Sequence, residues 1–342
     1  MKKLKLVFVL LSAMLISSVS YAGEVTVTGN AKASYQIIGG NNASAAQEVG
    51  KTLAIENELV FGAKGELDNG TTWTYSMQLD QGSVDDPSIT LTNGYGTLGI
   101  FQAAGGFNAK HFGSANVIGY GSQFGRGNSS GEFVDPYDIG GLSNIQYHSP
   151  AGLLPFGTVI KAAKGFAGSA TNKPGDAIGT ADTVSDATSY SIDIAPIDGL
   201  ALQAQYYTED ALSAKDQTGQ KKESGAYGAK YAVGNVTVGY TKGYVAPASG
   251  KTVASINEYV NTSYSVGLKL NDNLSVSYGV EESTANYTTD STADVTVEID
   301  SIQAAYTMGG MTVSASLKNV DNYSYSATND TNEATIFLSL AF

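Results

Sequence analysis

The sequence predicts an all-β protein, a 16-stranded antiparallel β-barrel that spans a membrane. Three observations predict this fold class: an export signal at residues 1–22, apolar and polar side chains that alternate through residues 23–342, and short turns that alternate strictly with long loops. A barrel strand in a membrane must show one apolar face to lipid, so alternation of this kind is typical of transmembrane barrels. The sequence therefore predicts a cleavable signal peptide followed by one barrel domain.

The first 22 residues have the three parts of a secretory signal peptide. Three lysines lie within the first five residues, an apolar run extends from Leu6 to about Ile16, and small residues follow at Ser20 and Ala22. This pattern predicts cleavage after Ala22. No later stretch is long and apolar enough to predict a membrane-spanning helix, so residues 23–342 are expected to form the barrel.

Alternation is clearest in residues 24–38, 71–80 and 311–318, where one face of each expected strand is apolar or small and the other is polar. Successive side chains of a strand point to opposite faces of the sheet, which gives this period of two. A soluble β-sandwich would show the same alternation. The connections between strands are needed to distinguish the two architectures.

Short turns and long loops follow each other without exception. Clusters of Asn, Asp, Gly and Pro, which favour tight turns, lie at residues 68–70, 93–96, 150–155, 196–199, 234–235, 271–273 and 309–310. Longer polar connections lie at about 39–50, 82–87, 104–141, 165–187, 208–222, 246–256, 288–294 and 324–332. Seven turns and eight loops separate sixteen strands, an even number that suits a membrane barrel with a water-filled interior.

Composition excludes several classes of function. The chain has no cysteine and a formal net charge of −13, which excludes disulfides and argues against a nucleic-acid-binding protein. Its two histidines, His111 and His148, are too few for a transition-metal cluster, so neither a metal nor another cofactor is expected. His148 is followed by Ser149, but neighbours on a strand point to opposite faces and cannot act as base and nucleophile. No catalytic residues and no enzyme activity are predicted.

Several stretches resemble one known family. Residues 104–141 form a very long connection after the fifth expected strand, preceded by NGYGTLGIFQ at 93–102 and followed by GLSNIQYHSPAGLLPFG at 141–157. In position and order these resemble loop 3 and its flanking strands in the general trimeric porins of Gram-negative bacteria, of the alphaproteobacterial type. The resemblance implies a homotrimer in the cell outer membrane, with loop 3 folded into the barrel as its constriction.

The final strand supports the same resemblance. Leu338, Leu340 and Phe342 lie on one apolar face of residues 332–342, and this ending resembles the C-terminal assembly signal of outer-membrane barrels. The resemblance implies that these three residues are recognised by the barrel assembly machinery. It also implies that the finished protein contacts outer-membrane lipid and lipopolysaccharide.

The long loop supplies the expected constriction residues. Glu132, Asp135 and Asp138 would form an acidic edge, with Lys110 and Arg126 as nearby counter-charges. Commoner members of the family carry several arginines on the opposite wall, whereas Arg126 is the only arginine of this chain. The usual arrangement of acids facing arginines is therefore not expected here.

Charged residues on the polar faces of the strands are expected to line the pore, because a Lys or Arg facing lipid at mid-membrane costs about 2–4 kcal/mol. The expected wall residues are Lys32, Glu56, Glu58, Lys64, Glu66, Asp80, Lys230, Lys269, Glu298, Asp300 and Lys318, together with Asp193 and Glu281.

Acids outnumber bases in this set, which predicts a channel with a weak preference for cations. The expected function is passive diffusion of small hydrophilic solutes and ions through the outer membrane. Two alternatives remain open at this point. Aromatic residues of the long loop, such as Phe107 and Phe112, would also suit a substrate-selective channel for sugars or amino acids, and long outer loops would suit a surface adhesin or receptor.

Overall fold

A computed structural model describes residues 23–41, 50–80, 82–118, 134–166, 186–210, 221–247, 256–288 and 292–342. The expected signal peptide and the loop residues Arg126 and Glu132 lie outside these ranges. The strands are β1 (Glu24–Gly40), β2 (Gly50–Glu66), β3 (Thr72–Asp80), β4 (Ser83–Asn93), β5 (Gly96–Phe101), β6 (Ser143–His148), β7 (Val159–Phe166), β8 (Asp186–Ile197), β9 (Leu200–Asp210), β10 (Lys222–Val233), β11 (Val236–Ala246), β12 (Ile256–Lys269), β13 (Leu274–Tyr287), β14 (Val295–Met308), β15 (Met311–Asp321) and β16 (Thr331–Ala341).

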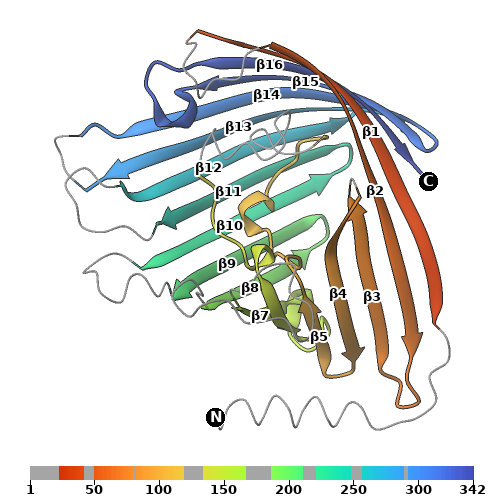
Figure 1. The fold of residues 1–342 in the computed structure, drawn as a ribbon. Coiled ribbons are helices and arrows are strands. Elements are labelled where there is room, and N and C mark those ends of the chain that lie inside the picture. Colours follow the sequence, from red (N-terminus) through yellow and green to blue (C-terminus); the bar gives the residue numbers. More distant parts are fainter. Residues whose placement is uncertain are drawn as a thin grey trace.

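These sixteen strands form one closed antiparallel barrel in which each strand pairs with its neighbours in the sequence (Figure 1). The ring closes where β1 pairs with β16, in a register that places Ala33 opposite Leu338. Two backbone hydrogen bonds between Gly29 and Phe342, of 2.8 and 2.9 Å, extend this seam. The predicted fold class and the predicted number of strands are therefore confirmed.

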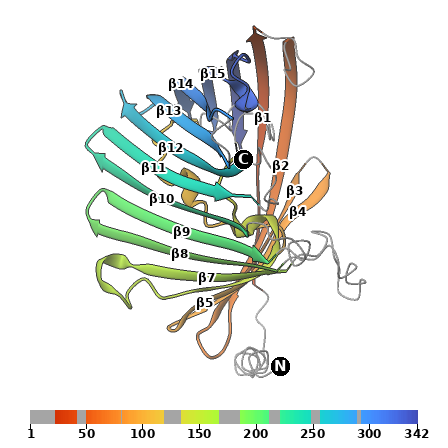
Figure 2. The same cartoon turned by 90° about the vertical axis from the view of Figure 1, so that its left-hand side faces the viewer.

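The turns join the strands where the sequence predicts them. Six of the seven predicted short turns join successive strands over a few residues, and the β6–β7 connection is longer because it contains the short helical turn η3 (Pro155–Gly157). Gly199 and Gly309 have φ angles of 75° and 59° in two of the hairpins, a region that only glycine enters without strain. Figure 2 shows these hairpins along one rim of the barrel.

The outer face of the barrel is apolar. Leu53, Ile302 and Leu317 are 75%, 56% and 61% exposed, respectively, as expected for side chains that would face lipid. On the same face the rings of Tyr227 and Tyr264 lie on either side of Tyr240, with centroids 6.2 and 5.4 Å from it. Among the described residues, no helix is both long and apolar enough to cross a membrane.

Among the described residues, buried apolar side chains form two clusters inside the barrel, each where a loop lies on the wall. One cluster contains Phe107 and Ile139 of the long loop together with Tyr207 of β9. The other contains Ile299 of β14 and Tyr323 of the helical turn η5 (Tyr323–Tyr325), which lies between β15 and β16. The remaining inner face is largely polar, so the loops rather than a central core occupy the interior.

Candidate functional site

The first described part of the long loop, residues 104–118, lies along the inner wall. We call it the outgoing limb. Five of its backbone N–H groups donate to polar side chains on the inner faces of β9 and of β11 to β14. The bonds run from Ala109 to Gln205 Oε1 (3.1 Å), from Gly113 to Thr241 Oγ1 (2.9 Å), from Ala115 to Ser265 Oγ (2.7 Å), from Val117 to Ser277 Oγ (2.9 Å) and from Ile118 to Gln303 Oε1 (3.0 Å). The outgoing limb therefore crosses from β9 to β14 and is held by five backbone hydrogen bonds to side chains of the wall.

Glycines on the inner face let the outgoing limb approach this closely. A Cβ atom at Gly267 would lie 2.5 Å from the carbonyl oxygen of Ala115, and one at Gly279 would lie 2.6 Å from Oδ1 of Asn116. Real Cβ atoms do not come so near to other heavy atoms, so a larger residue would push the limb away. A row of inward glycines on neighbouring strands thus marks the path of the loop.

Asp138 joins the outgoing limb to residues 134–141, which we call the returning limb. Its carboxylate accepts the N–H groups of Phe107 at 2.9 Å, of Asn108 at 2.6 Å and of Gly140 at 3.4 Å. A carboxylate that binds several backbone N–H groups makes strong, charge-assisted hydrogen bonds. The sequence predicts Asp138 as a constriction acid, and in the structure its oxygens are directed at the loop backbone.

Asp135 makes a second connection between the limbs. Its Oδ2 atom lies 3.4 Å from Nζ of Lys110 and 3.5 Å from Nε2 of His111. Burial alone would raise the pKa of Asp135, but hydrogen bonding and the positive charge at His111 and Lys110 outweigh it and hold the pKa below its usual value of 3.8. Lys110 and Asp135, two predicted constriction residues, thus form an ion pair.

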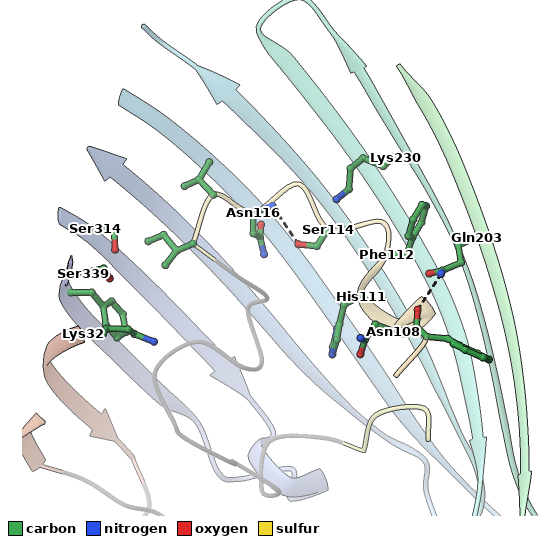
Figure 3. Close-up of a pocket in the computed structure, with 14 residues that line it drawn as sticks. Lys32, Asn108, His111, Phe112, Ser114, Asn116, Gln203, Lys230, Ser314 and Ser339 are labelled. Atoms are coloured by element: carbon green, nitrogen blue, oxygen red, sulfur yellow. Dashed lines mark hydrogen bonds between the residues drawn. The ribbon is translucent and has the colours of Figure 1, made fainter. Parts of the chain in front are cut away.

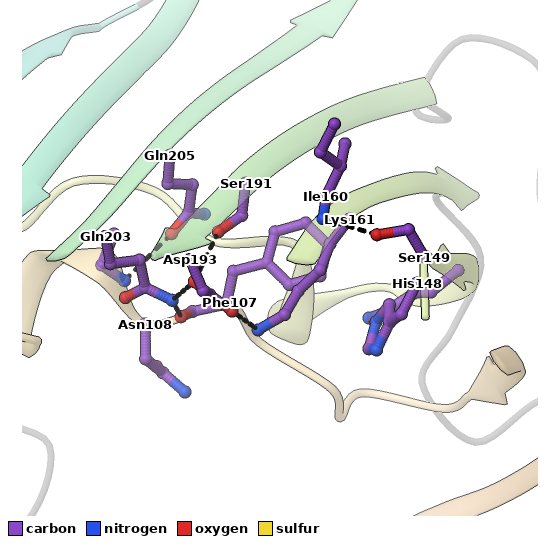
Figure 4. Close-up of polar contacts among 12 residues, drawn as sticks. Phe107, Asn108, His148, Ser149, Ile160, Lys161, Ser191, Asp193, Gln203 and Gln205 are labelled. Carbon is purple, nitrogen blue, oxygen red and sulfur yellow. Dashed lines mark hydrogen bonds and ion pairs between the residues drawn. The ribbon is translucent and has the colours of Figure 1, made fainter. Parts of the chain in front are cut away.

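A polar row on the inner wall supports the start of the outgoing limb (Figure 4). Asp193 accepts hydrogen bonds from Gln203 Nε2 at 2.7 Å and pairs with Lys161 Nζ at 2.5 Å. The same Gln203 amide donates to the carbonyl oxygen of Phe107 at 3.0 Å, and Lys161 lies 5.6 Å from the centre of the Phe107 ring. The sequence identified Asp193 but missed Lys161 and Gln203, although both follow the polar alternation of their strands.

A cavity of about 780 Å³ lies between the outgoing limb and the strands that face it (Figure 3). Lys230 and Gln203 line it beside the limb, and Lys32 and Phe337 line it from β1 and β16. Nζ of Lys32 lies 3.6 Å from Glu56 and 4.9 Å from the centre of the Phe337 ring. Phe337, an aromatic residue on a polar face, therefore has a cation–π partner.

Most of the predicted wall residues lie on the inner face, and two do not. The strand pairings put Lys32, Glu56, Glu58, Lys64, Glu66, Asp80, Asp193, Lys230, Lys269, Glu281 and Lys318 on the face that lines the barrel. Glu298 and Asp300 share the face of Ile302, which is 56% exposed on the outside. Their assignment to the pore wall is therefore wrong, because Val297 and Ile299 take the inward positions and pack under η5.

His148 lies on the inner face next to the long loop. Its Nε2 atom is 2.8 Å from Gln146 Oε1, and its ring meets the Phe107 ring at 6.0 Å in an edge arrangement. Ser149 instead donates and accepts hydrogen bonds with the backbone of Ile160 across the neighbouring strand. Within the described ranges no three His, Cys, Asp or Glu side chains are arranged to hold a metal ion.

A closed sixteen-stranded barrel with an apolar outer face, a polar inner face and a loop along its inner wall defines an outer-membrane channel. The chain belongs to the Gram-negative porin family, whose model matches residues 9–340. The resemblance of the sequence to Gram-negative porins is therefore confirmed, and the protein is located in the outer membrane. Family and fold indicate a channel rather than an enzyme.

Solved structures with the same fold include two porins and an outer-membrane protein. An anion-selective porin from Comamonas acidovorans is 12% identical with a TM-score of 0.67, over 94% of this chain and 100% of that one. The trimer form of OmpT from Vibrio cholerae is 12% identical with a TM-score of 0.65, over 94% and 100%. OmpF of Salmonella typhi in complex with daunomycin is 15% identical with a TM-score of 0.63, over 94% and 98%. No curated protein matches the chain by sequence.

Proposed function

We propose that the protein is a diffusion channel through which small hydrophilic solutes and ions pass passively, with a weak preference for cations. The observation that carries this proposal is the polar cavity of about 780 Å³ between the outgoing limb and the facing strands. Its lining includes hydroxyl and amide side chains such as Ser314 and Asn108, which can replace part of a solute's hydration. The long loop would set the width of the passage, and the wall charges would set its selectivity.

Unpaired charges on the inner wall support the cation preference. Lys161 and Lys318 are neutralised by Asp193 and Glu333. In the part of the chain that the structure describes, no ion pair involves Glu58 or Asp80, which lie directly opposite each other on β2 and β3. Two such acids raise the local concentration of cations and repel anions.

Two lysines on the inner wall oppose the attraction of cations by these acids and keep the preference for cations weak. Lys230 lines the cavity and has no acidic partner within the described ranges, and Lys32 is only loosely paired with Glu56 at 3.6 Å. Both would favour an anion at the narrow part of the passage. The net preference is therefore a balance between Glu58 and Asp80 on one part of the wall and these lysines on another.

The test is a reversal-potential measurement in a potassium chloride gradient, with the protein in a planar bilayer. The wild-type channel is expected to prefer potassium weakly. Glu58→Gln combined with Asp80→Asn should move the reversal potential toward chloride, and Lys230→Gln should move it the other way. A clear chloride preference of the wild type would reject the cation preference, whereas a wild type that inserts but does not conduct would reject the channel.

We also propose that the channel is a homotrimer that is exported with residues 1–22 as a signal peptide, assembled by the barrel assembly machinery and surrounded by lipopolysaccharide. Gly29, Ala31 and Ala33 are small residues on the outward face of β1, and small residues there would allow close contact between protomers. OmpT of Vibrio cholerae, which has a trimer form, shares the fold. Native mass spectrometry should give a trimer, and N-terminal sequencing of the exported protein should begin at Gly23.

A further inference from the structure

The hydroxyl group of Tyr325 connects two loops that are far apart in the sequence. Tyr325 lies in η5, within the connection between β15 and β16. Its hydroxyl oxygen accepts the backbone N–H of Val134 at 2.8 Å and lies 2.7 Å from Oγ of Ser283 on β13. Val134 is the first described residue of the returning limb, so the last loop of the barrel contacts the long loop at this point.

Four polar groups close a ring of hydrogen bonds around this contact. Oγ of Ser283 donates to Oδ1 of Asn261 at 3.1 Å, and Nδ2 of Asn261 donates to the carbonyl oxygen of Val134 at 2.9 Å. Because the single hydroxyl hydrogen of Ser283 is used on Asn261, Tyr325 is the donor in its bond to Ser283. The ring therefore starts at the N–H of Val134 and returns to its carbonyl oxygen, with each donor used once.

The ring is shielded from water. Ser283 is fully buried and Asn261 is 9% exposed, so a lost bond here is not readily replaced by a bond to solvent. The Tyr325 ring packs against Tyr259 with centroids 4.9 Å apart. Burial also raises the pKa of Tyr325, which keeps the phenol protonated and able to donate.

The backbone of the turn is held in an unusual conformation. Asn322, Ser324 and Tyr325 have φ angles of 57°, 56° and 56°, in the left-handed region that bulky residues rarely adopt. Conformations of this kind persist where surrounding contacts fix them, and they often mark functional positions. For Tyr325 the fixing contacts are the hydrogen-bonded ring and Tyr259.

We propose that Tyr325 is a latch that holds the returning limb of the long loop against β12 and β13 and thereby sets the aperture of the passage. Val134 precedes Asp135, whose carboxylate pairs with Lys110 and His111 of the outgoing limb. Fixing Val134 therefore fixes the ion pair that holds the two limbs together. The effect on aperture rests on the proposed channel function, whereas the latch itself does not.

A thiol-labelling experiment tests the latch without any conductance measurement. The chain has no cysteine, so Val134→Cys introduces a single thiol and keeps the backbone N–H and carbonyl groups of the ring. With Tyr325→Phe added, that thiol should react several-fold faster with a water-soluble maleimide, and Ser283→Ala should have the same effect. Tyr259→Phe is the matched control, because its hydroxyl makes no hydrogen bond within the described residues, and it should leave the rate unchanged.

Combining variants tests the ring as a unit. If Tyr325 and Ser283 act in one ring, Tyr325→Phe with Ser283→Ala should react no more than slightly faster than either single variant. Equal labelling rates in Tyr325→Phe and Tyr259→Phe backgrounds would overturn the latch, as would fully additive effects of the two ring substitutions.

Recordings in planar bilayers test the consequence for aperture. Tyr325→Phe should increase open-channel noise and shift the single-channel conductance, whereas Tyr259→Phe should match the wild type. Faster labelling with unchanged conductance would overturn the link to aperture and leave the latch standing. A wild type that does not conduct would reject the proposed function, and labelling would still decide on the latch.

Discussion

The backbones of Gly113 and Gly239 are in direct contact, so that a Cβ atom at Gly239 would be only 1.5 Å from the carbonyl oxygen of Gly113. A Cβ atom at Gly113 would also overlap β11, since it would lie 2.0 Å from the carbonyl oxygen of Tyr240, the residue after Gly239. In both cases the added Cβ atom would overlap a backbone oxygen, which cannot rotate out of the way as a side chain can. The outgoing limb and β11 are therefore in contact through two glycines.

Gly239→Ala should displace the outgoing limb from β11. Overpacking of this kind typically costs about 1–3 kcal/mol, and part of the cost can be relieved by movement of the loop. We expect a changed single-channel conductance with little change in the thermal stability of the barrel. Gly62→Ala is the control, because it also lies on an inner face but would meet only the hydroxyl of Thr26. Equal conductance of the two variants would contradict the close packing of the limb.

Asp138→Ala should loosen both limbs of the long loop. The substitution leaves the N–H groups of Phe107, Asn108 and Gly140 without their acceptor, and a lost acceptor costs about 1–3 kcal/mol where water cannot replace it. Limited proteolysis should cut the loop faster in Asp138→Ala than in the wild type, with an intermediate rate for Asp138→Asn. Unchanged proteolysis with a shifted reversal potential would instead identify Asp138 as a pore-lining acid.

The pairing of Asp135 predicts how the loop responds to acid. Because its pKa is held below 3.8 in the folded loop, its stabilising effect is fully present above the ordinary pKa and is lost as the pH falls through the lowered one. Conductance should therefore stay constant as the pH is lowered to about 4 and change below that. Asp135→Asn should show the altered conductance already at neutral pH. A wild-type transition well above pH 4 would contradict this assignment.

Lys318 and Glu333 form a buried ion pair between β15 and β16. Their side chains are 2% and 4% exposed, and Glu333 also accepts a hydrogen bond from Gln36 at 2.7 Å. Removing one partner of a buried pair typically costs about 3–5 kcal/mol because the other charge is left uncompensated. Lys318→Met should lower the melting temperature, and Lys318→Met with Glu333→Gln should recover part of the loss. A single variant as stable as the wild type would argue against the pair.

The architecture could be predicted because it depends on two regular patterns of the sequence, the spacing of the turns and the alternation of polar and apolar side chains. Strand number follows from turns at positions such as 234–235 and 309–310, and the faces follow from a period of two, which holds along β1 and β15. Glu298 and Asp300 break that expectation for a physical reason. Near the start of β14 the inward positions are apolar, since Val297 and Ile299 pack under Tyr323. The charges of Glu298 and Asp300 alone therefore predict the wrong face.

The path of the long loop could not be predicted from these two patterns. Its partners on the wall, such as Thr241 and Ser265, are single members of polar rows in which every residue looks equally suitable. The inward glycines at 228, 239, 267 and 279 were the missed signal. Glycine at matched positions of neighbouring strands indicates that another backbone approaches there. Tyr325 gives no comparable signal in the sequence, because the hydrogen bonds of its hydroxyl group with Val134 and Ser283 form only in the folded structure.

The seam between β1 and β16 has a consequence for folding. Its hydrogen bond from Gln36 to Glu333 joins residues 297 positions apart, whereas every other pair of neighbouring strands is also consecutive in the sequence. Contacts of such long range carry the largest entropic cost and form slowly. Until the seam forms, β1 and β16 present open edges with unpaired backbone groups. The nearly complete sheet, rather than the unfolded chain, is therefore the species in which two copies can most easily pair with each other instead of each closing on itself.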